Sequence, residues 1–144
     1  MVSRYRVAEL ADTSAWTWSD RETSLRQRFD GALAAGEIAT CDPVKLELLY
    51  GARNPSEFSV IRTRLDTLPQ CPVGPREWRR ALDVYEVLAH QGGLHHRHVK
   101  HPDLLIAAAA ESAGLQLVHY DADFETIAAV TGQPTRWLAP RGSL

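Results

Sequence analysis

Segments typical of β-strands alternate with segments of helical periodicity along this 144-residue chain. We expect strands at residues 7–11, 37–41, 115–120 and 136–138, and at most a short, irregular one at 68–73. We expect helices at residues 20–35, 57–65, 75–91, 102–113 and 124–132, and one more that begins at residue 42. Because parallel strands need crossover connections that helices supply, this alternation predicts an α/β domain with a mainly parallel sheet.

Three of the expected helices carry further information. Residues 102–113 combine leucines and isoleucine with four successive alanines, so we expect a helix that is buried on most sides. Asp42 stands before Pro43, and we interpret it as the N-cap of the helix that follows. Residues 75–91 repeat apolar side chains at helical spacing: Trp78, Leu82, Tyr85 and Leu88 or Ala89. We interpret the aromatics among them as core residues rather than an RNA-stacking platform.

The composition is that of an ordinary globular domain, with 44% hydrophobic residues, 24% charged residues and a net charge of −2. A slightly acidic chain is not a generally cationic nucleic-acid binder, so contact with RNA would need a locally basic surface or bound divalent cations. No apolar run could cross a bilayer, and the charged Arg4, Arg6 and Glu9 argue against a signal peptide, so we expect the cytoplasm. Cys41 and Cys71 lack zinc or CxxC spacing, and we expect buried apolar roles for both.

Acidic residues gather where the predicted topology places one edge of the sheet. Asp12 follows the first expected strand, and Asp121 follows the strand at 115–120. Asp103 lies in the first turn of an apolar helix, where the helix dipole favours an anion. Open α/β sheets bind ligands beyond the carboxyl ends of their strands, near helix N-termini. These three residues therefore predict a site, and Glu47, in the second turn of its helix, could point toward it.

Each acidic residue also has a purely structural interpretation. Asp103 could be a first-turn acid that stabilises its helix, and Asp121 could be the N-cap of the last helix, with Asp123 in its first turn. Glu47 could be a surface residue if its helix is rotated away. Capping explains each position singly, but it does not explain why so many acids should converge on one edge of the sheet.

Clustered carboxylates need counter-charge, because mutual repulsion would otherwise raise some of their pKa values. Mg2+ and Mn2+ prefer oxygen ligands, and two such ions about 4 Å apart can activate water and stabilise a leaving oxygen. That is the chemistry of phosphodiester hydrolysis. A glycine-rich phosphate loop and a GxSxG motif are both absent from the sequence, which removes two common alternatives.

The acidic positions stand in four ordered motifs that resemble those of PIN domains, in the compact form typical of VapC-type toxins of type II toxin–antitoxin systems. The motifs are Asp12-Thr13-Ser14-Ala15, Glu47-Leu48-Leu49-Tyr50-Gly51-Ala52, Pro102-Asp103-Leu104-Leu105-Ile106-Ala107-Ala108 and the segment from His119 to Ala128. The resemblance spans nearly the whole chain. It implies a single PIN domain over residues 1–144, with a five-stranded parallel sheet between layers of helices.

The resemblance also implies an activity and partners. It implies a Mg2+-dependent endoribonuclease that cuts tRNA or ribosomal RNA, with Mn2+ as another possible ion, and a homodimer inhibited by a small antitoxin that covers the acidic site. The implied metal ligands are Asp12, Glu47, Asp103 and Asp121, with Asp123 as an auxiliary or alternative ligand. Ser14 is expected to form a hydrogen bond within the site. Whether Asp121 or Asp123 binds metal directly stays open.

A histidine-rich stretch at residues 95–101 precedes Asp103. Its spacing does not fit a closed zinc site, so we interpret it as a polar loop, and we hypothesise that Arg97 and Lys100 contact RNA phosphates.

Two other functions remain as alternatives to the nuclease. One is a catalytically silent PIN-like module that binds RNA or protein. The intact acidic set argues against this alternative, because clustered carboxylates repel the phosphates of RNA. The other is a small-molecule phosphatase, which lacks support because no second aspartate follows Asp12 at the required spacing.

Overall fold

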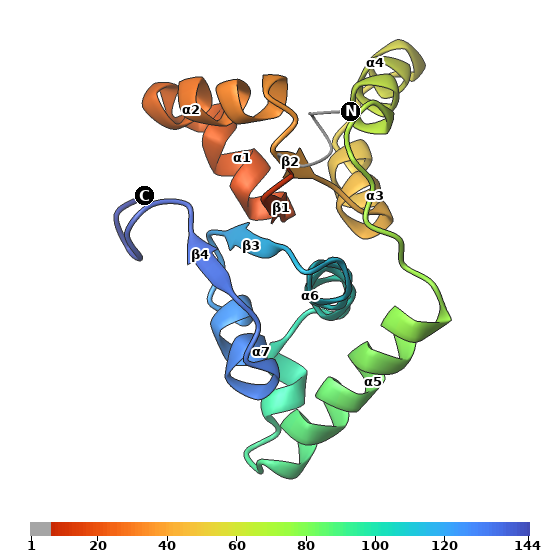
Figure 1. The fold of residues 1–144 in the computed structure, drawn as a ribbon, viewed down its shortest axis with the longest axis vertical. Coiled ribbons are helices and arrows are strands. Elements are labelled where there is room, and N and C mark those ends of the chain that lie inside the picture. The colour runs from red at the N-terminus through yellow and green to blue at the C-terminus, as the bar shows by residue number, and fades with distance from the viewer. Residues whose placement is uncertain (1–6) are drawn as a thin grey trace.

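A computed structural model describes residues 7–144 of the chain. Its sheet has four parallel strands in the order β2-β1-β3-β4, with β1 at Glu9–Ala11, β2 at Ile38–Ala39, β3 at Gln116–His119 and β4 at Thr135–Trp137 (Figure 1). The expected fold class is confirmed, and the strand expected at 136–138 is β4, at one edge of the sheet. The expectation of five strands is wrong by one.

The missing fifth strand is reduced to a single parallel bridge between Thr40 and Gln70. Thr40 donates its backbone N–H to Pro69 and accepts that of Cys71, at 2.9 and 2.8 Å. Pro69 and Pro72 flank this short pairing, and a proline has no N–H to give to a ladder of hydrogen bonds. Pairing therefore stops after one bridge.

Helices surround the sheet and supply most of the described structure (Figure 1). They are α1 (Thr13–Arg21), α2 (Thr23–Ala34), α3 (Asp42–Tyr50), α4 (Pro55–Asp66), α5 (Pro75–His90), the 3-10 turn η2 (His95–His98), α6 (His101–Ala113) and α7 (Asp123–Thr131). Among residues 7–144, no helix has the length and apolar character needed to cross a membrane.

The helix expected at residues 20–35 is α2, which begins at Thr23, whereas α1 at residues 13–21 was not predicted from the sequence; the extended backbone of Glu22 separates the two. The ring centroids of Trp16 on α1 and Phe29 on α2 lie 4.9 Å apart in an edge-to-face contact. One straight helix would separate these positions by roughly 20 Å, because each residue adds about 1.5 Å. Packing of Phe29 against Trp16 therefore requires the break.

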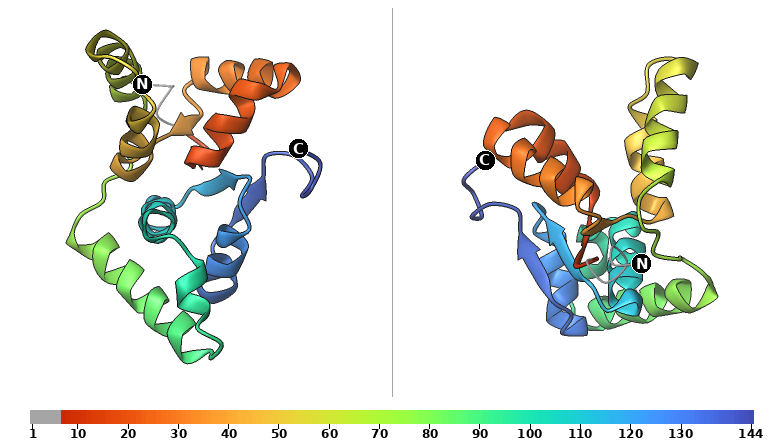
Figure 2. Two further views of the ribbon diagram at one scale, coloured as in Figure 1. Left: turned by 180° about the vertical axis from the view of Figure 1, so that it is seen from behind. Right: turned by 45° about the horizontal axis from the view of Figure 1, so that its top comes forward.

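Alternate residues of the strands face two different helical layers. Leu10 and Leu117 are opposite each other in the β1–β3 register and belong to a core with α3, α5, α6 and α7. Ala11 and Val118, one position further along, pack with α1 and α2. The two layers appear on opposite sides of the sheet when the molecule is turned (Figure 2). This alternation is what a parallel sheet covered on both faces requires.

Helix α6 is the centre of the larger core and lies between β3 and α5 (Figures 1 and 2). All residues from Asp103 to Ala110 are buried, which confirms the prediction of a helix covered on most sides. Its alanines let neighbouring elements approach closely. Gln133 closes one end of this core by donating its side-chain N–H to the carbonyl of Ala107, at 2.9 Å.

The structure corrects two predictions about other helices. Cys41, not Asp42, is the N-cap of α3, and Asp42 instead pairs with Lys45 at 2.9 Å. On α5 the buried face consists of Glu77, Ala81, Val84 and Leu88. Trp78 and Leu82 lie on the adjacent stripe and are 55% and 65% exposed, so they are not core residues. The apolar stripe of α5 is wider than its contact with α6, so the side of the stripe that carries Trp78 and Leu82 is left uncovered.

Both cysteines are buried and free, as predicted. Burial raises the pKa of Cys41 to about 12 and that of Cys71 to about 11. At pH 9 an ordinary thiol with a pKa near 8.5 is mostly thiolate, whereas Cys71 would be thiolate in only about one molecule in a hundred. Since the thiolate is the reactive form, alkylation of the native protein should be slow.

We therefore expect iodoacetamide at pH 9 to leave both thiols of the native protein largely unmodified, as measured by intact mass. Unfolding in guanidinium should expose them and give two additions within minutes. Rapid labelling of the native protein at either position would contradict the burial of that cysteine.

Candidate metal centre

The site begins where β1 and β3 end side by side. Ala11 is in register with Val118, so the residues that follow these strands leave the same edge of the sheet. Asp12 comes directly after β1, and its backbone N–H donates to the carbonyl of Val118 at 3.1 Å. Asp121 follows β3 after Tyr120. Parallel pairing thus brings to one edge two acids that are 109 positions apart in the sequence.

Asp12 is also the N-cap of α1, a role that the sequence analysis did not assign. Its carboxylate accepts the backbone N–H of Ala15 at 3.0 Å and the hydroxyl of Ser14 at 2.7 Å. The residue is buried, and burial raises its pKa to about 6 although these hydrogen bonds act in the opposite direction. The cap fixes the orientation of the carboxylate.

Ser14 connects the two strand ends. Its oxygen accepts the backbone N–H of Tyr120 at 2.7 Å while its hydroxyl donates to Asp12. One side chain thereby holds the segment after β1 against the segment that leads to Asp121. The described contacts of Ser14 are thus with Asp12 and with the backbone of Tyr120, and its role in a metal site stays a prediction.

His119, the last residue of β3, contacts the segment that leads to Asp121 from the buried side. Its role was not singled out from the sequence. Its ring is fully buried, with centroids 5.2 Å from Phe124 and 4.8 Å from Trp137. Burial lowers its pKa to about 4, so the imidazole is neutral near pH 7. The neutral ring can accept at Nδ1 the backbone N–H of Asp121, at 3.2 Å. No sequence signal distinguishes this contact from that of any other strand residue.

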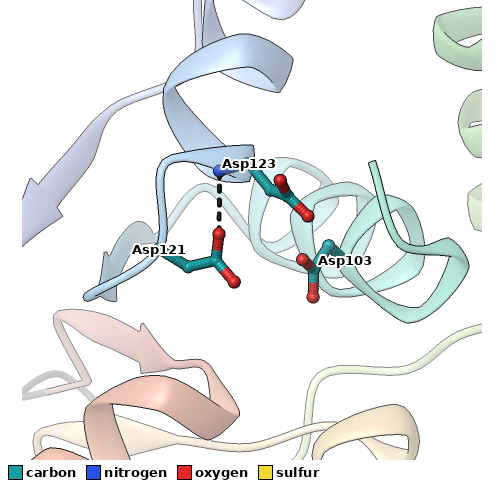
Figure 3. Close-up of side chains that lie close together, drawn as sticks. All are labelled: Asp103, Asp121 and Asp123. Carbon is teal, nitrogen blue, oxygen red and sulfur yellow. Dashed lines mark hydrogen bonds between the residues drawn. The ribbon is translucent and has the colours of Figure 1, made fainter. Parts of the chain in front are cut away.

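Three aspartates converge beside this edge. Carboxylate oxygens of Asp103, Asp121 and Asp123 all lie within 4.8 Å of one another. Asp103 projects from the first turn of α6, whereas Asp121 and Asp123 stand at the start of α7, and their carboxyl groups point into a common space (Figure 3). The backbone N–H of Asp123 donates to Asp121 at 2.9 Å, which orients that carboxylate (Figure 3).

Asp103 is the member of the trio that most needs a partner. The residue is 3% exposed, and its Oδ2 atom forms no hydrogen bond among the described residues. Burial and the nearby carboxylate of Asp123 raise its pKa to about 8. A buried carboxylate oxygen that accepts no hydrogen bond and faces two other carboxylates fits the oxygen-rich donor set of a divalent cation.

Lys100 supplies the positive charge next to this trio. Its Nζ atom lies 2.9 Å from Asp121, 3.1 Å from Asp123 and 3.4 Å from Asp103. Its backbone N–H also donates to Asp123 at 3.2 Å. These carboxylates raise the pKa of the ammonium, although burial acts in the opposite direction. From the sequence we hypothesised that Lys100 contacts RNA, which stays a prediction; in the structure its ammonium lies among the acids.

Glu47 stands at the border of the site rather than in the trio. Its carboxylate accepts the hydroxyl of Thr13 at 2.6 Å, so α3 is linked to the residue next to Asp12. Thr13 was part of the first quoted motif, but its contact with Glu47 depends on the packing of α1 against α3. Neither Asp12 nor Glu47 belongs to the group whose oxygens lie within 4.8 Å.

The histidine-rich stretch does not form a comparable group. Among the described residues, the aspartate trio is the one cluster of three or more His, Cys, Asp or Glu side chains with the spacing of a metal site. His101 instead meets the hydroxyl of Tyr85 at 3.2 Å. Arg97 lies exposed on η2, and its contact with RNA stays a prediction.

Comparison with known proteins agrees with this geometry. Residues 10–130 match the family model of the PIN domain. The chain is similar to Ribonuclease VapC18 of Mycobacterium tuberculosis, with 47% identity over 133 residues that cover 92% of this chain and 96% of that protein. It is also similar to Ribonuclease VapC51 of the same organism, with 39% identity over 135 residues, which are 94% of this chain and 96% of that protein.

Solved structures give the same fold. A DNA-bound VapBC from Salmonella typhimurium matches with a TM-score of 0.70 and 21% identity, over 92% of this chain and 99% of that one. VapBC-5 from Mycobacterium tuberculosis matches with a TM-score of 0.56 and 26% identity, over 91% and 97% of the two chains. The acidic edge, the family match and these relatives lead to one conclusion: this chain belongs to the PIN domain family and groups there with the VapC-type ribonucleases.

Proposed function

We propose that this protein is a Mg2+-dependent endoribonuclease that cleaves tRNA or ribosomal RNA in the cytoplasm. The convergence of Asp103, Asp121 and Asp123 within 4.8 Å is the observation that carries the proposal, because three carboxylates at that distance call for a cation. Relatives named Ribonuclease VapC at 47% and 39% identity support the choice of RNA as substrate. We propose that residues 1–144 act as one domain.

We assign metal-binding roles to Asp12, Glu47, Asp103 and Asp121, with Asp123 as an auxiliary ligand. A bound Mg2+ would polarise the phosphodiester and lower the pKa of a water molecule, and Mn2+ could replace it. The chain contributes fixed positions for these acids. Ser14 and the cap of α1 orient Asp12, the N–H of Asp123 orients Asp121, and burial on α6 immobilises Asp103.

A catalytically silent module that binds RNA or protein is the alternative function. An acidic edge repels phosphates, so a pure RNA-binding protein would gain nothing from keeping it. Total cellular RNA incubated with the purified protein, with Mg2+ and then with a chelator, separates the two functions. Absence of any Mg2+-dependent fragment from the wild-type protein would favour the binding module.

Replacement of Asp103 by Asn should abolish Mg2+-dependent cleavage. We expect a rate loss of more than about 100-fold, because changes beyond the direct ligands already cost 10- to 100-fold in metal sites. Asn matches the shape of Asp and needs no counter-charge when buried, so the thermal midpoint should not fall. The rate is measured on a fluorescent RNA at fixed Mg2+.

The matched control is Asp83→Asn, which removes an exposed aspartate on α5. It should keep full activity and the wild-type salt dependence. Equal cleavage by the Asp103→Asn and wild-type proteins would show that the trio is not the metal centre.

We further propose a small antitoxin as a protein partner, which would cover the acidic site. The matching solved structures include complexes described as VapBC toxin–antitoxin systems, and this supports the proposal. A groove lined by Trp16, Leu48, Val60 and Ile61 lies between α1, α3 and α4, with Asp20 and Arg64 at its sides. Its mixed apolar and charged lining is suited to a segment of a different chain.

The antitoxin proposal makes a cellular prediction. Expression of this chain alone should arrest bacterial growth, and co-expression of the protein encoded immediately upstream should restore it. The Asp103→Asn variant should be harmless in either case but should still co-purify with that protein. Growth arrest that the upstream protein does not relieve would contradict this partner.

We also propose a homodimer, which the resemblance to VapC-type toxins implies. A second surface carries the exposed apolar side chains of Leu46 on α3 and of Trp78 and Leu82 on α5, with Leu105 of α6 between them. We name these four residues the α3–α5 patch. Its lining is mostly apolar, and an apolar patch of this kind suits a self-complementary contact between two copies.

Replacement of Trp78 by Glu should convert the dimer to a monomer, because the dimer would bury a charge without a partner. Light scattering coupled to size-exclusion chromatography measures the mass. Val60→Glu places the same charge on exposed α4 and should leave the dimer intact. A dimer that survives Trp78→Glu would exclude the α3–α5 patch as its interface.

A further inference from the structure

We infer that the ammonium of Lys100 is a tethered counter-cation that occupies the cation position among Asp103, Asp121 and Asp123 in the metal-free protein and must leave when a divalent cation binds. This inference rests on the proposed metal-dependent function. It assigns Lys100 a role in setting metal affinity, which differs from contact with RNA.

The geometry of the ammonium carries the inference. Lys100 Nζ meets all three carboxylates of the cluster, at 2.9, 3.1 and 3.4 Å. Among residues 7–144, no other Lys, Arg or His nitrogen lies within ion-pair distance of these carboxylates. An ammonium is a compact point charge with three donors, so it can sit among several oxygens much as a metal ion does.

One space cannot hold both cations. The oxygens of the trio lie within 4.8 Å of one another, and a divalent ion bound to them would stand next to Nζ in its present position. Two positive centres at such a distance repel each other, and both would compete for the same lone pairs. Metal binding therefore requires Nζ to move.

The side chain of Lys100 is freer to move than the side chains of its three partners, which are 5%, 26% and 17% exposed for Asp103, Asp121 and Asp123. It is 58% exposed, and its four-carbon stem can turn the ammonium into water. The Asp103 side chain is only 5% exposed on the buried helix α6. The backbone of Lys100 is held separately by its N–H bond to Asp123, so the loop need not change when the ammonium leaves.

Removal of the ammonium provides the first test. Lys100→Met keeps an apolar stem and deletes the charge, so three carboxylates face one another with no internal cation. We expect a lower thermal midpoint in chelator and up to about fivefold tighter Mn2+ binding by calorimetry, the scale on which partly exposed ion pairs act. Mn2+ should then raise the midpoint of the variant more than that of the wild type.

The chain offers a matched control. The chain has only two lysines, and the other one is Lys45. Its ammonium lies 2.9 Å from Asp42 and 3.4 Å from Asp66. Lys45→Met should also lower the thermal midpoint in chelator, but Mn2+ affinity should stay at the wild-type value. A general effect of deleting a paired lysine would appear in both variants.

The wild-type protein provides a second test that needs no variant. With 15N-labelled lysine, each ion-paired ammonium should give its own slowly exchanging NMR signal, and the Lys45→Met protein assigns the two. Addition of Mg2+ should abolish or shift the Lys100 signal and leave the Lys45 signal unchanged. A Lys100 ammonium that keeps its signal while Mg2+ binds would overturn the inference.

The outcomes separate this inference from the proposed function. Equal Mn2+ affinity of the Lys100→Met and wild-type proteins would overturn the role of Lys100 and leave the metal centre standing. If that variant also lost part of the salt dependence of RNA binding, Lys100 would be a phosphate contact instead. No Mn2+ binding by either protein would overturn both proposals.

Discussion

Strands β1 and β3 pair in parallel with Ala11 opposite Val118, and the acidic edge exists only because of this register. The register is fixed by burial on both faces of the sheet. A shift of β1 by one residue relative to β3 would turn Leu10 away from the core around α6 and place it in the layer of α1 and α2. The position of Asp12 relative to Asp121 is therefore determined by packing that lies inside the domain, not by the acids themselves.

The same packing creates an electrostatic problem at the edge. Burial raises the pKa of Asp12 to about 6 and that of Asp103 to about 8, so the fold works against the ionised forms of both. Hydrogen bonds from Ser14 and Ala15 to the carboxylate of Asp12 stabilise its ionised form and offset part of the rise in its pKa. Asp103 has no such donors among the described residues, and its Oδ2 atom lacks a hydrogen bond. A cation is the remaining way to stabilise its charge.

The sequence was sufficient for the parts of the fold that follow from local patterns. Apolar segments that end at Asp12 and Asp121 predicted strands that stop at one edge, and the alanine-rich run predicted a buried α6. Contacts between distant elements could not be predicted in this way. The break at Glu22 depends on Phe29 meeting Trp16, and the exposure of Trp78 depends on which stripe of α5 faces α6. The same applies to Lys100, whose partners include two aspartates more than 20 positions away.

The choice of basic residue at the site follows from the shape of each charge. The chain has fourteen arginines and two lysines. Two of the arginines form two-pronged contacts with a single carboxylate: Arg136 with Glu9, at 2.8 and 2.8 Å, and Arg80 with Glu111, at 2.8 and 3.1 Å. Both lysines instead lie where several aspartates converge, because a point charge can be shared among oxygens in different planes and a planar fork cannot.

The two lysines differ in how firmly they are held. Lys45 is 14% exposed and so has little room to move, whereas Lys100 is 58% exposed and can reach solvent by rotation of its side chain alone. An ammonium that pairs with these acids but is attached through an exposed stem can neutralise the site and still leave it open to a metal ion. Lys100 therefore satisfies two requirements that otherwise conflict. Without a metal ion, the three aspartates need a nearby positive charge, and a metal-dependent reaction needs that position to become free.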